Sequence, residues 1–148
     1  MITYLKRDIT TVEFGIIMQG VNTRGVMGSG VALAIRNKWP VVYDEYKKQP
    51  TGKHMLGYVN MVYINDILYV ANCFTQEYFG KDGRKYASVS AVAECLESCI
   101  TYATALVLPL YMPKIGSGLG GLNWSLDVEP IVNNLSEKNN IDIFVCDI

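Results

Sequence analysis

Residues that bind metals are scarce in this sequence. Its 148 residues include four cysteines and a single histidine, His54. The cysteines form no CxxC pair and the aspartates form no DxD pair, so the usual spacings of metal sites are missing. We therefore expect no metal and no cofactor, and we interpret the cysteines as structural thiols in a reducing compartment. Cys95 and Cys99 lie four residues apart in a predicted helix, where both can face the core.

Long apolar runs and an excess of one charge are also missing. No apolar run approaches the ~20 residues of a membrane span, and Met1 leads directly into a strand-like segment, so we expect neither a membrane partner nor a signal peptide. Lysine and arginine total 13 against 14 acidic residues, and the resulting net charge of −1 argues against binding to duplex nucleic acid. Half of the residues are hydrophobic, which suits one buried core. We expect residues 1–148 to form a single, soluble, monomeric domain in the cytoplasm.

Apolar residues follow the period of strands in some segments and that of helices in others. The pattern predicts strands over 2–6, 14–20, 55–64, 67–74, 106–112 and 141–148, with a hairpin turn at Asn65-Asp66. It predicts a helix over 31–39 and a second short helix, with Pro40 in its first turn, that runs through 43–48. Two more helices are predicted, one from a cap at Ser88 or Ser90 and one from a cap at Asn123 or Ser125 to about Glu137. This order of elements predicts an α/β sandwich with a mixed sheet.

Two glycine-rich loops stand in the same context, each between a buried strand and a helix. They read VNTRGVMGSG over 21–30 and KIGSGLGGL over 114–122. Glycine lets a ligand approach the backbone closely, and the free N–H groups at the start of a helix favour an anion. Neither loop is a Walker A motif. GSGLGG over 116–121 has the glycine spacing of GxGxxG, but it lies near the C-terminus and not after the first strand, where a Rossmann fold has it. One such loop alone would more often be a plain tight turn. Two of them at one edge of a sheet favour a clamp around a pyrophosphate.

The same two segments carry a resemblance to a known family. GVNTRGVMGSGVA over 20–32 and MPKIGSGLGGLNW over 112–124 resemble the two ligand loops of macrodomains. The chain looks most like the branch that contains the terminal ADP-ribose protein glycohydrolase, the DNA ADP-ribosyl glycohydrolase antitoxin and small phage and bacterial ADP-ribose-1''-phosphate phosphatases. The resemblance implies a three-layer α/β/α fold with a mostly parallel sheet that binds ADP-ribose at the carboxyl ends of its strands. For a phage-encoded chain, the expected location is the host cytoplasm.

The resemblance also assigns roles near the two ends of the ligand. Asp8 matches the aspartate that accepts a hydrogen bond from the adenine amino group, with the backbone of Ile9 nearby; the alternative for Asp8 is a turn or cap residue. Asn22 falls beside the distal ribose, where its amide can orient a hydroxyl or a water, and it is our candidate catalytic residue. Asn72 and Phe74 end a strand beside the same ribose, although Phe74 is equally consistent with the core.

The loops themselves are expected to hold the diphosphate. The residues that match the phosphate-binding positions of the family are Gly28, Ser29, Gly30, Val31, Ser117, Gly118, Leu119, Gly120 and Gly121. Gly116 more simply serves the turn, and Lys114 either assists a phosphate or is solvated.

Three activities are open at this point. The glycohydrolases of the branch use a lysine whose place falls near Phe74-Thr75 and, in one member, an aspartate whose place is Gly120; both are missing. Lys81 and Lys85 follow in the next loop and are possible substitutes. Hydrolysis of ADP-ribose-1''-phosphate needs mainly positioning and electrostatics, which the loops can provide. We therefore expect a phosphatase first, an ADP-ribose reader without catalysis second, and a glycohydrolase third.

Overall fold

The computed structural model describes residues 1–80, 86–117 and 120–148. Within these ranges one six-stranded sheet has the order β1-β6-β5-β2-β4-β3. The strands are β1 (Ile2–Lys6), β2 (Gly15–Asn22), β3 (Val59–Asn65), β4 (Leu68–Gln76), β5 (Leu110–Met112) and β6 (Ile143–Asp147). β3 pairs antiparallel with β4 and the other neighbouring strands are parallel. The predicted mixed, mostly parallel sheet is confirmed.

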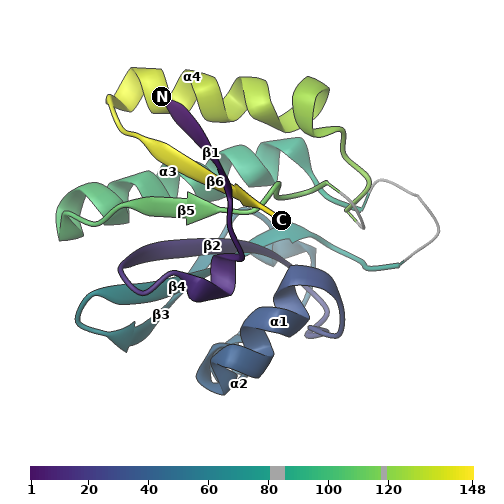
Figure 1. The fold of residues 1–148 in the computed structure, drawn as a ribbon. Coiled ribbons are helices and arrows are strands. Elements are labelled where there is room, and N and C mark those ends of the chain that lie inside the picture. The colour runs from purple at the N-terminus through teal and green to yellow at the C-terminus, as the bar shows by residue number, and fades with distance from the viewer. Residues whose placement is uncertain (81–85, 118–119) are drawn as a thin grey trace.

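Helices cover both faces of this sheet, which makes the three-layer α/β/α fold that the resemblance implied. The four α-helices of the described residues are α1 (Gly30–Lys38), α2 (Pro40–Lys47), α3 (Val89–Leu106) and α4 (Glu129–Asn139). Figure 1 shows α3 and α4 together on one face and α1 and α2 together on the other. Short single turns at Ile9–Thr11 and Lys53–Met55, and a wider turn at Trp124–Val128, connect these elements.

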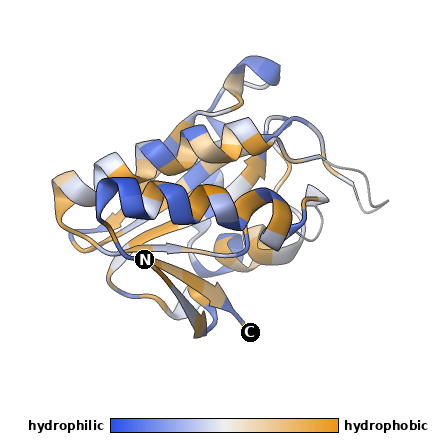
Figure 2. Cartoon of the chain, turned by 90° about the horizontal axis from the view of Figure 1, so that it is seen from above, coloured by the Kyte–Doolittle hydropathy of each residue, from blue (hydrophilic) through white to orange (hydrophobic). Residues whose placement is uncertain are grey.

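The sheet is buried on both faces, and its side chains alternate between two hydrophobic clusters. On β2, Ile16 and Met18 pack in the cluster beneath α3 and α4, whereas Ile17 packs in the cluster beneath α1 and α2. All three are fully buried, and burying one such side chain is worth about 1.5–3 kcal/mol. Figure 2 shows the corresponding pattern, with mostly hydrophobic strands and helices in alternating hydrophobic and hydrophilic bands. A strand buried on both faces explains the continuous apolar run in this part of the sequence.

Two strands, β3 and β5, begin four residues later than predicted. The strand predicted over 106–112 is only Leu110–Met112, because α3 continues to Leu106 and ends in a left-handed residue, Val107 (φ 55°). The strand predicted from residue 55 begins at Val59 instead, because a single turn and Gly57 (φ 89°) come first. In both places the apolar pattern of the sequence runs through a change of backbone conformation.

The helix ends resolve the alternatives that the sequence left open. Ser88 rather than Ser90 caps α3, since its hydroxyl accepts a hydrogen bond from the N–H of Ala91 at 3.2 Å. Asn123 rather than Ser125 caps the turn before α4, with its side chain accepting from the N–H of Leu126 at 3.0 Å. α4 ends at Asn139, and Asn140 follows in the left-handed conformation at φ 50°.

The four cysteines are all buried and free. Cys95 and Cys99 both face the core beneath α3, as their spacing predicts, and the sulfur atoms of Cys73 and Cys99 lie 3.9 Å apart. Hydrogen bonding to the neighbouring thiols Cys95 and Cys99, together with burial, raises the pKa of the Cys73 thiol. Among the described helices, none combines the length and the apolar character that crossing a membrane would demand.

Candidate ligand-binding cleft

A cleft of about 570 Å³ lies at the carboxyl ends of the central strands β2, β4 and β5. The residues that line it are 19–22, 26–32, 75–76, 79–80, 113–117 and Gly120. Parallel strands place these ends at one edge of the sheet, and the crevice there is where open α/β sheets bind ligands. Both glycine-rich loops therefore meet at one site, although about 90 residues separate them in the sequence.

The first glycine-rich loop ends at the N-terminus of α1, which forms one wall of the cleft. Ser29 is the N-cap residue, and its side chain makes no capping hydrogen bond. The Ser29 carbonyl accepts a hydrogen bond from the N–H of Leu33 at 3.3 Å, which is the first bond of the helix. The N–H groups of Gly30 and Val31 come before Leu33, so they have no carbonyl partner within the helix and point out of its end. Gly30 has φ 61°, and nothing lies within 4 Å of the place where a Cβ would stand. The wall is thus an open, partly positive surface of backbone donors.

The second loop forms the opposite wall and is tightly folded on itself. Gly116 has φ 79°, and a Cβ there would lie 2.9 Å from Cδ1 of Leu122, so the turn requires glycine. The Gly116 carbonyl accepts from the N–H of Leu122 at 3.0 Å and closes the loop. Ser117 and Gly120 line the cleft, whereas Gly121 does not. The predicted ligand residues Gly118 and Leu119 lie outside the described residues.

Asn22 ends β2 and organises the first loop from within. Its Oδ1 accepts from the N–H of Arg24 at 3.0 Å and from the N–H of Val26 at 3.3 Å. Its Nδ2 donates to the Val26 carbonyl at 2.6 Å, and its second amide hydrogen has no partner among the described residues. Asn22 lines the cleft as predicted, but most of its hydrogen-bonding capacity holds the loop. One N–H remains for a ligand, and the catalytic role stays a prediction.

Tyr46 of α2 holds Asn22 in place. The buried tyrosine hydroxyl lies 2.7 Å from the main-chain oxygen of Asn22 and 2.9 Å from its Oδ1. Burial raises the pKa of Tyr46 to about 12, so the hydroxyl remains a donor at any ordinary pH. The helix beneath the first loop thereby fixes the loop's position over the cleft.

Asp8 and Ile9 lie at the end of β1, which β6 and β5 separate from β2, and they do not line the cleft. Asp8 caps the turn Ile9–Thr11, because its Oδ1 accepts from the N–H and the hydroxyl of Thr10 at 3.0 and 2.7 Å. The Thr10 hydroxyl and N–H also lower the pKa of this exposed carboxyl. Ile9 is buried against the α1 side of the sheet. Asp8 is therefore an ionised acceptor on the adjoining surface, and its role toward adenine stays a prediction.

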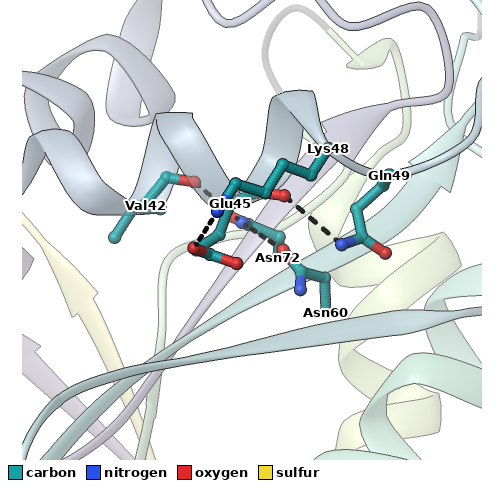
Figure 3. A network of polar contacts seen from close by, with 6 residues as sticks. All are labelled: Val42, Glu45, Lys48, Gln49, Asn60 and Asn72. Atoms are coloured by element: carbon teal, nitrogen blue, oxygen red, sulfur yellow. Dashed lines mark hydrogen bonds and ion pairs between the residues drawn. The ribbon is translucent and has the colours of Figure 1, made fainter.

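Asn72 and Phe74 lie in the interior and not on the cleft wall. Asn72 donates from Nδ2 to the Val42 carbonyl at 3.3 Å and to Oδ1 of Asn60 at 3.1 Å, as Figure 3 shows. Phe74 packs against Tyr46 with ring centroids 5.8 Å apart. Both side chains support residues of the cleft, and the structure does not bring either one to its surface.

Several lining residues have no part in the prediction from sequence. They are chiefly Gln19, Thr75, Gln76, Phe79 and Ile115. Gln19 carried a readable signal, because it is a polar residue inside the otherwise apolar run FGIIMQG. Such a residue in a strand buried on both faces needs a specific partner. Thr75 and Gln76 gave no comparable signal, since polar residues are common where a strand ends.

Charged side chains are nearly absent from the described part of the cleft wall. The one charged residue there is Lys114, whose Nζ lies 3.1 Å from Oδ2 of Asp147. Lys114 lowers the pKa of that carboxyl. Within the described ranges no three His, Cys, Asp or Glu side chains group as metal ligands would. Lys81 and Lys85 lie outside the described residues. The cleft as described can bind an anion through backbone donors, and its walls carry neutral hydroxyl and amide groups.

Comparison with known proteins gives three kinds of match. The Macro domain family model matches residues 18–131. A solved structure of a protein of unknown function from Bacteroides thetaiotaomicron is 32% identical, with a TM-score of 0.85 over 100% of this chain and 98% of that one. A macrodomain protein from Streptomyces coelicolor is 26% identical, with a TM-score of 0.81 over 100% and 99% of the two chains.

A curated relative adds a named activity. The chain is 26% identical to a DNA ADP-ribosyl glycohydrolase of Thermus aquaticus, over 98% of this chain and 41% of that protein. Two mycobacterial proteins with the same name match over 42% of their length. The chain thus spans about two fifths of the length of these three relatives.

Proposed function

Because the chain belongs to the macrodomain family, we propose that its cleft binds ADP-ribose and that it hydrolyses ADP-ribose-1''-phosphate to ADP-ribose and phosphate. The observation that carries this proposal is the meeting of both glycine-rich loops in one cleft at the carboxyl ends of the central strands. The family model covers both loops, which supports the assignment of the cleft.

Charge and position suggest how ADP-ribose would lie. The diphosphate suits the N-terminus of α1, where the free N–H groups of Gly30 and Val31 and the positive end of the helix favour an anion. Asp8 lies toward β1, on the side where adenine would extend. The distal ribose would then lie at the ends of β2 and β4, beside Asn22 and Thr75.

Phosphate release would proceed by attack of one water molecule on the 1''-phosphorus. A P–O bond forms to the water oxygen, the bond from phosphorus to the sugar oxygen breaks, and a proton from the water ends on that sugar oxygen. Backbone donors can stabilise the negative charge that spreads over the phosphoryl oxygens. Asn22 would orient a ribose hydroxyl through the amide hydrogen that its bond to the Val26 carbonyl leaves free. Since no carboxylate or imidazole lines the described part of the cleft, we expect slow turnover.

A second candidate is removal of ADP-ribose from a nucleic acid. The match to the Thermus aquaticus DNA ADP-ribosyl glycohydrolase, at 26% identity, favours it. Against it, Phe74 and Thr75 stand near where the branch places its lysine, and Gly120 stands where one member has an aspartate. A lysine from 81–85 would have to replace the missing group. We rank the phosphatase activity first, binding of ADP-ribose without catalysis second, and this glycohydrolase activity third.

Two assays on the same protein separate these candidates. Purified chain is incubated with ADP-ribose-1''-phosphate, and phosphate is measured; in parallel it is incubated with an ADP-ribosylated DNA oligonucleotide, and free ADP-ribose is measured. Phosphate release that Asn22→Ala abolishes is the expected result. Release of ADP-ribose from the oligonucleotide alone would replace the phosphatase by the glycohydrolase. No release from either substrate, with ADP-ribose still bound, would leave a reader.

A further inference from the structure

Three buried oxygen atoms without hydrogen-bond partners gather at this one cleft. They are Gln19 Oε1, Thr75 Oγ1 and Ser117 Oγ, and among the described residues no other buried side-chain nitrogen or oxygen lacks a partner. All three residues line the cleft, and they come from β2, β4 and the second loop. A polar atom buried without a partner is costly, so their shared location indicates that a bound ligand completes their hydrogen bonds.

Of the three, Gln19 has an orientation that its neighbours dictate. Its Nε2 donates to Oδ1 of Asn72 at 2.7 Å, and Asn72 donates from Nδ2 to the main-chain carbonyl of Val42. A carbonyl only accepts, so Asn72 must turn its NH₂ group toward Val42 and its oxygen toward Gln19. Figure 3 shows Asn72 beneath α2, where the Val42 carbonyl approaches it. Gln19 must then present its NH₂ group to Asn72, which leaves Oε1 for the cleft.

We propose that Gln19 is a specificity-determining residue whose Oε1 accepts a hydrogen bond from a hydroxyl group of the distal ribose. This inference rests on the proposed binding of ADP-ribose. Gln19 lies on β2 opposite Asn72 of β4, on the side of the cleft away from Asp8 and from the proposed adenine position. An amide oxygen held in this orientation accepts and cannot donate, so it favours a hydroxyl there and disfavours a phosphate oxygen. Together with the anion site at α1, this acceptor would give the bound ligand a single direction.

The test compares ligands as well as variants. Binding constants are measured calorimetrically for ADP-ribose, for ADP, which has no distal ribose, and for ADP-ribose analogues that lack the 2''- or the 3''-hydroxyl. With the native chain, one of the two deoxy analogues should bind about tenfold more weakly than ADP-ribose. Gln19→Met keeps the length of the side chain and removes the acceptor. In this variant the affinity for ADP-ribose should fall about tenfold, while the affinity for ADP should not change. Unchanged binding of ADP also shows that the variant is folded.

A matched control tests whether the hydrogen bonds from Val42 through Asn72 to Gln19 orient the Gln19 amide. Asn60→Ala removes the second partner of Asn72 but leaves the Val42 carbonyl to orient it, so the preference for ADP-ribose over its deoxy analogue should persist. Equal binding of ADP-ribose and both deoxy analogues to the native chain would overturn the assignment, whether or not Gln19→Met folds. In that case the proposed function stands. If ADP-ribose itself does not bind, the proposed function fails and this assignment fails with it.

Discussion

At the scale of single residues, Asn22 and Tyr46 decide the shape of the cleft. The motif predicts Asn22 as a site residue, and the structure places it on the cleft wall. Its partner could not be predicted, because Tyr46 lies 24 residues further on, in helix α2, and nothing in a local pattern encodes that contact. The hydroxyl of Tyr46 supports a main-chain oxygen and an amide oxygen together. We therefore expect Tyr46 to matter both for stability and for the first loop.

Replacing Tyr46 by phenylalanine tests this role. The variant should lose about 1–2 kcal/mol of unfolding free energy at pH 7, because two buried acceptors lose a donor. The folded-state pKa is raised to about 12 from 10, so the native hydroxyl contributes its stability fully below pH 10 and loses it as the pH rises from 10 to 12. The difference between the native chain and Tyr46→Phe should therefore narrow above pH 10. Urea unfolding of both proteins at pH 7 to 11 measures this difference in unfolding free energy. A difference that stays constant over this range would contradict the role of the Tyr46 hydroxyl as a buried donor.

Residues inside the sheet were harder to interpret from sequence than those in the loops. Asn72 and Phe74 were expected beside the ligand, yet the structure buries both and leaves their ligand contacts as predictions. The register of β4 on β2 decides which of its side chains reach the cleft, and a shift by one residue exchanges the two faces. A single sequence does not contain that register. The polar Gln19 in an apolar strand was the one visible sign of the network beneath the cleft.

At the scale of elements, the N-terminus of α1 carries the proposed anion site. Gly30→Ala should change ADP-ribose affinity only modestly, because the Cβ meets open space and the strain of φ 61° is its main effect. Gly30→Glu adds a carboxylate at the same place, and it should weaken binding at least tenfold beyond the alanine variant, through repulsion of the diphosphate. Calorimetry on the two variants measures the difference. Equal affinities of Gly30→Ala and Gly30→Glu for ADP-ribose would contradict the assignment of the diphosphate to the N-terminus of α1.

Helix α3 offers a prediction about capping that does not involve the ligand. Ser88→Ala removes the hydroxyl that accepts from the N–H of Ala91, and it should cost about 1 kcal/mol of unfolding free energy. Ser90→Ala is the matched control, since Ser90 lies inside the first turn and does not cap, and it should cost less than about 0.5 kcal/mol. Both values come from urea denaturation. A larger loss in Ser90→Ala than in Ser88→Ala would reverse this assignment of the cap.

The sequence predicts element types more reliably than element ends. Long periodic segments such as α3 follow the pattern of Val92, Leu96 and Cys99, whose spacing turns them to one face. β5 was overestimated because Leu106 and Leu108 are apolar in a helix end and a connection as well as in a strand. The apolar pattern was misleading at this boundary, because Leu106 and Val107 are exposed although both are apolar.

At the scale of the whole molecule, topology brings the two glycine-rich loops together. The residue pattern indicates six strands in a mixed sheet, but the order β1-β6-β5-β2-β4-β3 depends on pairings between distant segments. In that order β2 and β5 are parallel neighbours, so their ends lie side by side and residues 26–32 and 113–117 face one cleft. The resemblance to macrodomains led to the correct architecture where local patterns alone reached only an α/β sandwich. Neither the local patterns nor the resemblance predicts which activity the chain has, because the same loops serve binding and catalysis in this family.

The most direct test of this account is a calorimetric titration of the native chain with ADP-ribose. We predict saturable binding of one ADP-ribose per chain, with a dissociation constant on the order of micromolar, that ADP-ribose-1''-phosphate competes for. Absence of binding at millimolar ADP-ribose, by a chain that unfolds cooperatively in urea, would contradict the assignment of the cleft.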